Sequence, residues 1–326
     1  MGASDEMIAI YIVGGVLLVL ATAFFGILRW CYGKAFYHPP KHRRLDTLTA
    51  VNEIRDETAH APMVALAQRL VSEPFERVSI RSRDGLLLTG RYYHITDSNR
   101  LEILFHGWRS NALRDACGGA KIARDVGFNQ LIVDQRAHGD SDGKTVTFGI
   151  LEKYDCLDWV NYAVDRFGKD VQILLGGVSM GAATVLMASS LPLPENVVAI
   201  TADCGYTSPE AIIRKVCRDM GIPDRLGYPF VRMSARVFGG FSLADGGALE
   251  AVKSARVPIM IMHGEEDDFV PFSMSKEIYD ACASPKRYLS VPRAGHGTSY
   301  FYDIDGYSQA VGAFKIAAFE GKKGED

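Results

Sequence analysis

The first apolar segment of the chain is long and uninterrupted. Residues 8–28 are almost wholly apolar and carry no charged side chain. About 20 such residues are enough to span a bilayer as an α-helix. A cleaved signal peptide is the alternative, but it would begin with basic residues rather than Asp5 and Glu6, and its apolar core would be shorter. The pattern therefore predicts a transmembrane anchor in residues 1–30.

The charges on either side of this segment predict its orientation. Acidic residues precede it, whereas five basic residues follow it: Arg29, Lys34, Lys41, Arg43 and Arg44. Because Lys and Arg collect on the cytoplasmic side of a membrane helix, we expect a single-pass membrane protein whose remaining residues lie in the cytoplasm. The six cysteines are scattered and are expected to be reduced, which agrees with that compartment.

Residues 31–73 link the anchor to the rest of the chain. Pro39 and Pro40 stiffen a basic spacer, which is expected to lie near anionic lipid headgroups. A helix is expected to begin at Asp46 or Thr47 and to continue to Ser72. The pattern leaves open whether this helix packs on the following domain or also covers its active site.

From residue 74 to residue 326 the pattern changes to short elements that form one domain. Alternation over 75–80, a turn at 84–85 and an apolar run over 86–94 predict a β-hairpin. Further strands are expected at 101–105, 129–133, from 171 onward, 197–202, 257–262 and 288–291, and helices at 114–126, 149–167, 182–190 and 307–319. An antiparallel start followed by alternating strands and helices predicts an α/β fold whose mostly parallel sheet is covered on both faces. Catalytic residues are then expected at the carboxyl ends of the strands.

Composition excludes several classes of function. Hydrophobic residues make up 48% of the 326 residues and charged residues 23%, which is typical of a chain that buries a full core. The net charge of −3 gives no indication of nucleic-acid binding. The cysteines lack the spacing of a zinc site, and residues 140–143 lack the spacing of an EF-hand. We therefore expect no metal, no cofactor and no nucleic-acid partner.

One predicted turn carries a candidate nucleophile. Residues 177–181 read Gly-Val-Ser-Met-Gly, which fits G-x-S-x-G, and they lie between a buried strand and an alanine-rich helix. So sharp a turn strains the serine backbone and lifts the Ser179 hydroxyl above the sheet edge, beside the positive end of a helix. A chance serine in a glycine-rich turn is the alternative, but the strand and helix on either side favour a nucleophile.

A serine nucleophile needs a base, and the base needs an orienting group. Of the eight histidines, His296 alone follows every plausible acid, in a glycine-flanked loop after the last predicted strand. The chain order nucleophile, acid, histidine therefore favours His296 as the base. Asp203 ends one predicted strand, and four more acids compete after the next strand: Glu265, Glu266, Asp267 and Asp268.

At this loop the chain resembles the α/β-hydrolase superfamily. The acid loop of that superfamily commonly reads H-G-x-x-D-x-x-V-P, and this pattern falls on His263, Gly264, Asp267, Val270 and Pro271. The resemblance implies that Asp267 is the acid. Asp268 is the second choice and Asp203 the third, since some members place the acid at the earlier strand. The two glutamates are expected to face solvent.

The resemblance also indicates which groups bind the oxyanion. The backbone N–H of Met180, directly after the nucleophile, is one expected donor. His106-Gly107-Trp108 matches an H-G-x turn of the superfamily, which makes the Trp108 backbone N–H the second donor. His106 is then expected to fix this loop rather than to act as a base. Residues 134–143 resemble D-x-R-x-H-G-x-S-x-G and are interpreted as structural, with Arg136 and His138 bracing loops near the site.

Residues 204–256 lie where the superfamily usually carries a lid, and two or three short helices are expected there. Their apolar side chains suit an acyl or aromatic ester, but they equally suit packing on the sheet. The resemblance implies a serine hydrolase that cleaves an ester, thioester or amide of a small or lipid-like acyl substrate through an acyl-enzyme. A carboxylesterase or lipase-like activity is favoured over a peptidase.

Other functions are weighed against this one. An acyltransferase or a small-peptide aminopeptidase would use the same triad and stays open. A binding protein on this fold would normally have lost a triad member, and this chain keeps all three. Dehalogenases and epoxide hydrolases use an aspartate nucleophile, so Ser179 argues against them.

Overall fold

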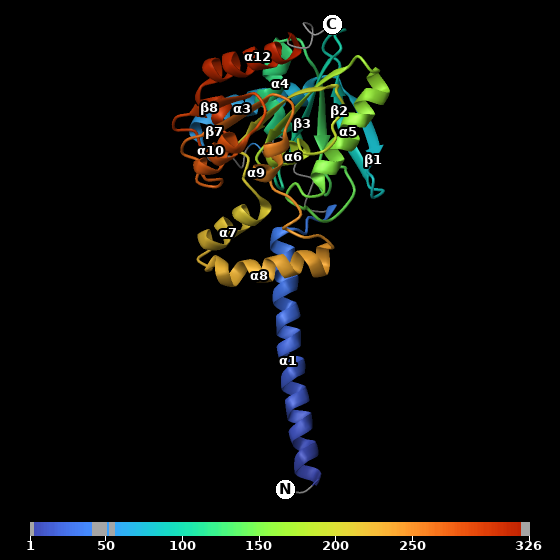
Figure 1. The fold of residues 1–326 in the computed structure, drawn as a ribbon, viewed down its shortest axis with the longest axis vertical. Coiled ribbons are helices and arrows are strands. Elements are labelled where there is room, and N and C mark those ends of the chain that lie inside the picture. Colours follow the sequence, from blue (N-terminus) through green and yellow to red (C-terminus); the bar gives the residue numbers. More distant parts are fainter. Residues whose placement is uncertain (1–2, 41–50, 52–55, 321–326) are drawn as a thin grey trace.

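The helix α1 (Ala3–Ala35) is the most extended feature of the computed structural model, which describes residues 3–40, 51 and 56–320. It projects far from the rest of the chain, with the N-terminus at its distant end (Figure 1). Its side chains are exposed over residues 7–27, whereas Leu28 and Cys31 are buried where α1 enters the body. Because an 18-residue window within Met7–Ala35 has a mean hydropathy of 2.5 and is unburied, the predicted apolar helix is present as a candidate membrane span.

Part of the predicted linker lies outside the described residues, namely the basic residues Lys41, Arg43 and Arg44 and the predicted caps Asp46 and Thr47. The described helix α3 (Glu57–Ser72) begins after Asp56, whose carboxylate accepts hydrogen bonds from two backbone N–H groups of its first turn. The other oxygen of Asp56 accepts a hydrogen bond from the Tyr302 hydroxyl at 3.0 Å. The buried Met63 and Ala67 pack against the domain, so α3 belongs to the same folded unit as the domain.

Among the described residues, eight strands form one sheet in the order β1-β2-β4-β3-β5-β6-β7-β8. Their bounds are β1 (Glu76–Arg81), β2 (Leu87–Tyr93), β3 (Arg100–Phe105), β4 (Asn129–Asp134), β5 (Gln172–Val178), β6 (Val197–Asp203), β7 (Ile259–Gly264) and β8 (Lys286–Val291). The β1–β2 hairpin is antiparallel and β2 pairs antiparallel with β4, while all other pairs are parallel. The predicted mostly parallel sheet is confirmed.

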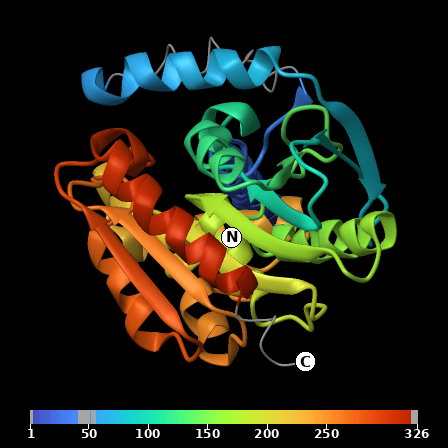
Figure 2. The same ribbon diagram turned by 90° about the horizontal axis from the view of Figure 1, so that it is seen from above.

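Helices cover both faces of this sheet (Figure 2). They are α4 (Ala112–Asp125), α5 (Glu152–Phe167), α6 (Met180–Ala188), α10 (Phe272–Ala281), α11 (Ser299–Tyr302) and α12 (Ile304–Glu320). Successive side chains of a strand point to opposite faces. On β7, Ile261 joins the core cluster that contains residues of α5, α6 and α10, whereas Met260 and Met262 join the cluster that contains residues of α3, α4 and α12. The continuous apolar pattern of the predicted strands follows from this double coverage.

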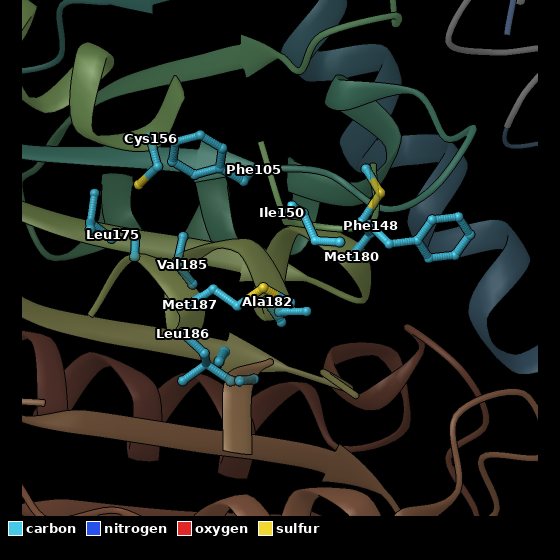
Figure 3. Close-up of a cluster of buried hydrophobic side chains, with 14 of the residues drawn as sticks. Phe105, Phe148, Ile150, Cys156, Leu175, Met180, Ala182, Val185, Leu186 and Met187 are labelled. Carbon is cyan, nitrogen blue, oxygen red and sulfur yellow. The ribbon is translucent and has the colours of Figure 1, made fainter. Parts of the chain in front are cut away.

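The helix α6 lies in the centre of the larger core. All nine of its residues are buried. Figure 3 shows Val185, Leu186 and Met187 of this helix in one cluster with Leu175 of β5 and Cys156 of α5. The turn that joins β5 to α6, and with it Ser179, is therefore held from both sides by well-packed elements.

Between β6 and β7 the chain leaves the sheet, in the region where short lid helices are predicted. It forms α7 (Pro209–Asp219), α8 (Asp224–Ser234), the π-helical turn η2 (Ala235–Gly239), α9 (Ala248–Ala251) and the 3₁₀ turn η3 (Val252–Ser254). In Figure 1, α8 runs across α1 just outside the body. The ring of Phe230 lies 5.9 Å from that of Phe24, and the ring of Phe238 lies 5.8 Å from that of Tyr32. The sequence does not predict this contact between the lid region and α1.

Candidate active site

Ser179 stands at the turn between β5 and α6. Its backbone has φ 56° and ψ −114°, a strained conformation for a residue with a side chain. A Cβ atom on Gly181 would lie 2.0 Å from the carbonyl oxygen of Phe105, and a Cβ atom on Gly177 would lie 2.3 Å from the carbonyl carbon of Gly181. Both glycines are therefore needed for the helix to approach the sheet. The backbone N–H of Ser179 donates to the carbonyl of Asp203 at 2.8 Å, which holds the turn against β6.

Asp267 and His296 reach Ser179 from the loops that follow β7 and β8, respectively. The His296 Nε2 lies 2.9 Å from the Ser179 Oγ, and the His296 Nδ1 lies 2.7 Å from the Asp267 Oδ2. A Cβ atom on Gly264 would lie 2.2 Å from the carbonyl oxygen of Ala294, so this glycine lets the two loops pass close together. The structure thus brings the three predicted triad residues into one hydrogen-bonded chain, which is the arrangement that activates a serine.

The Asp267 carboxylate is completely buried and surrounded by donors. Its Oδ1 accepts hydrogen bonds from the backbone N–H groups of Phe269 at 3.0 Å and Val270 at 2.8 Å. Its Oδ2 lies 3.1 Å from the Nε2 of His263, in addition to the contact with His296. Burial on its own raises the pKa of Asp267, but hydrogen bonds from the two imidazoles outweigh burial and hold the pKa well below its usual range.

The other candidate acids do not reach His296. Three of them are exposed in the loop after β7: Glu265, Glu266 and Asp268. Asp203 is buried at the end of β6, where its Oδ1 accepts a hydrogen bond from the Ser299 hydroxyl at 3.2 Å and its Oδ2 accepts one from the Tyr307 hydroxyl at 3.0 Å. Burial raises the pKa of Asp203, and the neighbouring imidazoles and hydroxyls offset this only in part. The Asp203 oxygens therefore bind hydroxyls of α11 and α12 and do not contact His296.

The loop after β3 is fixed on both sides of Trp108. The backbone N–H of Gly107 donates to the Asp115 Oδ2 at 2.7 Å, and the backbone N–H of Arg109 donates to the His138 Nε2 at 2.9 Å. The Trp108 peptide between them is held in place by these two hydrogen bonds. Arg109 adopts a positive φ of 48°, so the loop turns sharply after Trp108.

The two predicted oxyanion donors belong to segments next to the nucleophile. A Cβ atom on Gly107 would lie 3.4 Å from the Ser179 Cβ, which places this loop directly against the serine. The backbone N–H of Trp108 forms no hydrogen bond within the described residues. Met180 is the first residue of α6, where a backbone N–H has no acceptor inside the helix. Both N–H groups are therefore free to bind a developing negative charge beside Ser179.

His106 and His138 brace this loop, as the resemblance implies. The His106 Nε2 accepts a hydrogen bond from the backbone N–H of Gln135 at 3.1 Å, so its Nδ1–H donates to the next residue's carbonyl at 2.8 Å. The His138 Nε2 accepts from Arg109, so its Nδ1–H donates to the carbonyl of Arg136 at 2.9 Å. The two rings lie 4.6 Å apart. With both rings committed in this way, neither is placed to act as the base.

Arg136 anchors the adjoining segment. Its guanidinium donates two hydrogen bonds of 2.6 Å to the buried carboxylate of Asp155 and two, of 2.8 and 3.3 Å, to the carboxylate of Asp84. A bidentate pair of this kind fixes geometry in both partners. The segment that carries His138 is thereby tied to α5 and to the β1–β2 hairpin.

The last turn of α1 also contacts the loop after β3, a contact that sequence reasoning did not predict. The Trp108 Nε1–H donates to the carbonyl of Ala35 at 3.1 Å. The Arg109 Nη2 donates to the carbonyls of Gly33 at 3.1 Å and Tyr37 at 2.8 Å. The final carbonyls of a helix lack intrahelical donors and attract a cation. The end of α1 therefore helps to position the loop that carries a predicted oxyanion donor.

Two cavities meet at the candidate nucleophile, and Ser179, Trp108 and Phe269 line both of them. The smaller cavity, of about 230 Å³, is partly polar, with Ser110, Arg114, Asp115, His296 and Thr298 among its walls. Met63 of α3 also lines it, so α3 both packs on the domain and borders the site. The larger cavity, of about 510 Å³, is lined mainly by apolar side chains from α1, α7 and α8. The two sides of the serine thus offer different chemistry to a substrate.

Cys204, Asp267 and His296 place possible metal-ligand atoms within 4.8 Å of one another. Burial raises the pKa of the Cys204 thiol well above its ordinary value, and the carboxylates of Asp203 and Asp267 raise it further. Both ring nitrogens of His296 are already engaged, Nδ1 with the Asp267 Oδ2 at 2.7 Å and Nε2 with the Ser179 Oγ at 2.9 Å. The cluster therefore fits a hydrogen-bonded triad better than a metal site.

Comparisons with known proteins bear on this geometry. A family model described as the alpha/beta hydrolase family matches residues 103–310. YqkD of Bacillus subtilis (strain 168) is 26% identical over 252 residues, which cover 75% of this chain and 82% of that protein. The lysophosphatidylserine lipase ABHD12 of Danio rerio is 27% identical over 177 residues, which cover 51% of this chain and 42% of that protein. The solved structure of the Pyrococcus furiosus esterase Pf2001 is similar in fold, with a TM-score of 0.60, 23% identity, and coverage of 76% of this chain and 93% of that one.

Proposed function

The chain belongs to the alpha/beta hydrolase family, and from this premise we propose that it is a serine hydrolase that cleaves an ester bond of an acyl substrate. The observation that carries the proposal is the hydrogen-bonded chain from Ser179 through His296 to Asp267, with distances of 2.9 and 2.7 Å. A serine that only shaped the turn before the helix would not need an imidazole at its hydroxyl. A serine that attacks an acyl group needs one, because the imidazole takes the hydroxyl proton.

The geometry supports a two-step reaction. As the Ser179 Oγ attacks the carbonyl carbon of the ester, the His296 Nε2 takes its proton, and the carbonyl oxygen becomes an oxyanion bound by the N–H groups of Trp108 and Met180. His296 then gives that proton to the alcohol as the carbon–oxygen bond breaks and an acyl-enzyme remains. Water repeats the attack and releases the acid. Asp267, whose pKa is held low, stays ionised and stabilises the imidazolium.

A lipid-like acyl ester is the substrate class that the site favours. The apolar cavity beside Ser179 suits an aliphatic or aromatic acyl group. A matched relative is named a lysophosphatidylserine lipase and a structural neighbour is named an esterase, which agrees with ester chemistry. An acyltransferase would form the same acyl-enzyme and pass the acyl group to an alcohol or amine instead of water.

An aminopeptidase fits the cavities less well. Such an enzyme needs a carboxylate for the ammonium group of its substrate. The described walls of the larger cavity include no Asp or Glu. In the smaller cavity, Asp115 already accepts hydrogen bonds from the backbone N–H of Gly107 and from the Arg114 Nε. We therefore place peptide hydrolysis behind ester hydrolysis.

We also propose that α1 anchors the enzyme with its catalytic domain in the cytoplasm. The support is the exposed apolar surface of residues 7–27, the acids before it and the basic residues after it. The six cysteines are unpaired and buried, as in a reducing compartment. Protease treatment of intact cells or spheroplasts is expected to leave the domain uncut, and digestion from outside would reverse this orientation.

The proposed activity is tested at the nucleophile. Ser179→Ala is expected to lower turnover of a nitrophenyl ester by about 10³-fold or more. A fluorophosphonate should label Ser179 in the wild type, as mapped by mass spectrometry. Ser254→Ala, at an exposed position in η3, is the matched control and should keep full activity. Turnover like that of the wild type in a folded Ser179→Ala variant would contradict the proposal.

A further inference from the structure

The exposed part of α1 fixes where a bilayer lies relative to α8. Residues 7–27 present apolar side chains on all sides of the helix, so lipid must surround them if α1 spans the membrane. Phe24, near the end of this stretch, contacts Phe230 of α8 with 5.9 Å between ring centroids. Because α8 runs across α1 at this level (Figure 1), it lies at the boundary between the bilayer and water.

Exposed side chains of α8 and η2 match that position. Four of them are large and apolar, although water alone would disfavour them: Met233, Val237, Leu226, which also lines the larger cavity, and Phe238, which also contacts the Tyr32 ring of α1. Three exposed arginines accompany them: Arg225, Arg232 and Arg236. Exposed apolar and basic side chains on one helix are typical of a helix that lies in the interfacial plane, where arginine heads reach the lipid headgroups.

The larger cavity connects this boundary with the nucleophile. At its inner end lie buried residues, including Ser179, Tyr206 and Ile213. At its outer end lie Ile27 of α1, which is 47% exposed, and Leu226 of α8, which is 61% exposed. The cavity therefore runs from the catalytic serine to the surface between α1 and α8. Its walls are almost entirely aliphatic and aromatic along this path.

On the basis of the proposed serine hydrolase activity, we propose that α1, α7 and α8 enclose an acyl-chain passage that opens onto the bilayer. In this arrangement α1 is a wall of the substrate site as well as an anchor. The passage selects esters of a single long aliphatic chain, which partition into the membrane and reach Ser179 from the side without crossing water. The polar part of such a substrate occupies the smaller cavity, among Ser110, Arg114 and Thr298.

A photoreactive probe tests the course of the passage in the unmodified full chain. A fluorophosphonate that carries a long alkyl chain with a terminal diazirine is added to the protein in phosphatidylcholine vesicles. The phosphonate should attach to Ser179, and irradiation should link the chain end to residues 27–35 of α1 or to α7 and α8. Links confined to α3 and α4, around the smaller cavity, would overturn the passage. Absence of any label on Ser179 would instead contradict the hydrolase proposal itself.

Obstruction of the passage provides the second test. Val216 lies on the cavity wall of α7, and Val216→Trp should lower hydrolysis of a long-chain nitrophenyl ester by about 10-fold or more. The indole would displace part of the acyl chain, and each methylene of the chain that is no longer buried weakens binding. Hydrolysis of nitrophenyl acetate should stay within about two-fold, since its acyl group needs no passage. Val71→Trp is the matched control, because Val71 is exposed near the end of α3 and lines neither cavity. Full long-chain activity in a folded Val216→Trp variant would contradict the passage.

Discussion

Asp203 and Asp267 lie at the ends of the neighbouring strands β6 and β7, both buried near His296, yet their surroundings differ. Two imidazoles and two backbone N–H groups surround the Asp267 carboxylate. Only the hydroxyls of Ser299 and Tyr307 donate to the Asp203 carboxylate within the described residues. Burial raises the pKa of both carboxyls, and it is outweighed at Asp267 but not at Asp203. A buried carboxylate is thus ready to stabilise a cation only where enough donors keep it ionised.

The largest expected effect separates the two acids by activity. Asp267→Asn should lower turnover of a nitrophenyl ester by about 10⁴-fold, because an amide favours the wrong imidazole tautomer at His296. Asp203→Asn should cost less than about 10-fold, since its oxygens do not contact the base.

Steady-state kinetics with a thermal melt of each variant provides the measurement. Asp268→Asn, in the exposed neighbour of the proposed acid, is the control and should behave like the wild type. If Asp203→Asn and Asp267→Asn lost activity equally, the orienting acid would belong to β6 or be shared between the two strands.

A second, smaller effect tests why Asp267 stays ionised. The His263 Nε2 lies 3.1 Å from the Asp267 Oδ2 and 3.0 Å from the carbonyl oxygen of Val270. A single N–H at this nitrogen can donate to both oxygens. His263→Ala should lower kcat/KM by about 10-fold, the value of one hydrogen bond to a charged group. The acid limb of the stability profile, measured as melting temperature against pH, should also move to higher pH, because the pKa of Asp267 loses a donor that lowers it.

The conservative variant separates positioning from packing. His263→Gln keeps an N–H donor at a similar distance from the backbone and should recover part of the activity and return the acid limb toward its original position. Equal loss in both variants with an unchanged pH profile would mean that His263 only fills space.

The sequence was sufficient for most of the architecture of the domain because its signals are local. The alternation of strands and helices, and the turn around Ser179, depend on residues within about one element of each other. The bounds of the strands and helices that were predicted for the domain differ from those observed by at most three residues, whereas α10 and α11 were not predicted. At α4, for example, the apolar pattern predicts a start at residue 114, but the helix begins at Ala112. The Asn111 side chain accepts hydrogen bonds from the backbone N–H groups of Leu113 and Arg114 and so caps the helix earlier.

The rest required contacts that no local pattern records. Asp267 and Asp268 are adjacent in the chain, and only the folded loop decides which carboxylate meets the donors. The Trp108 indole bonds to a carbonyl 73 positions earlier, at the end of α1. The sequence predicts an anchor and a lid separately, but the cavity between them exists only because α8 lies across α1. The proposed acyl-chain passage therefore depends on the part of the molecule that was least predictable.

The smallest expected effect concerns stability, and it has opposite signs at the two acids. The unfolded pKa of an aspartate is about 3.9. At Asp267 the folded pKa is lower, so this group contributes stability that is present above that pH and is lost as the pH falls. At Asp203 the folded pKa is higher, so its contribution is present at low pH and is lost as the pH rises toward the folded value. Asp267→Asn should therefore be most destabilising near neutral pH, whereas the melting temperature of Asp203→Asn should improve relative to the wild type as the pH rises above about 4. Melting curves of the full chain in detergent at several pH values, with shifts of about 2 °C or more per kcal/mol, provide the measurement. Parallel pH dependence in the two variants would show that both carboxylates share one environment and would remove the distinction between β6 and β7.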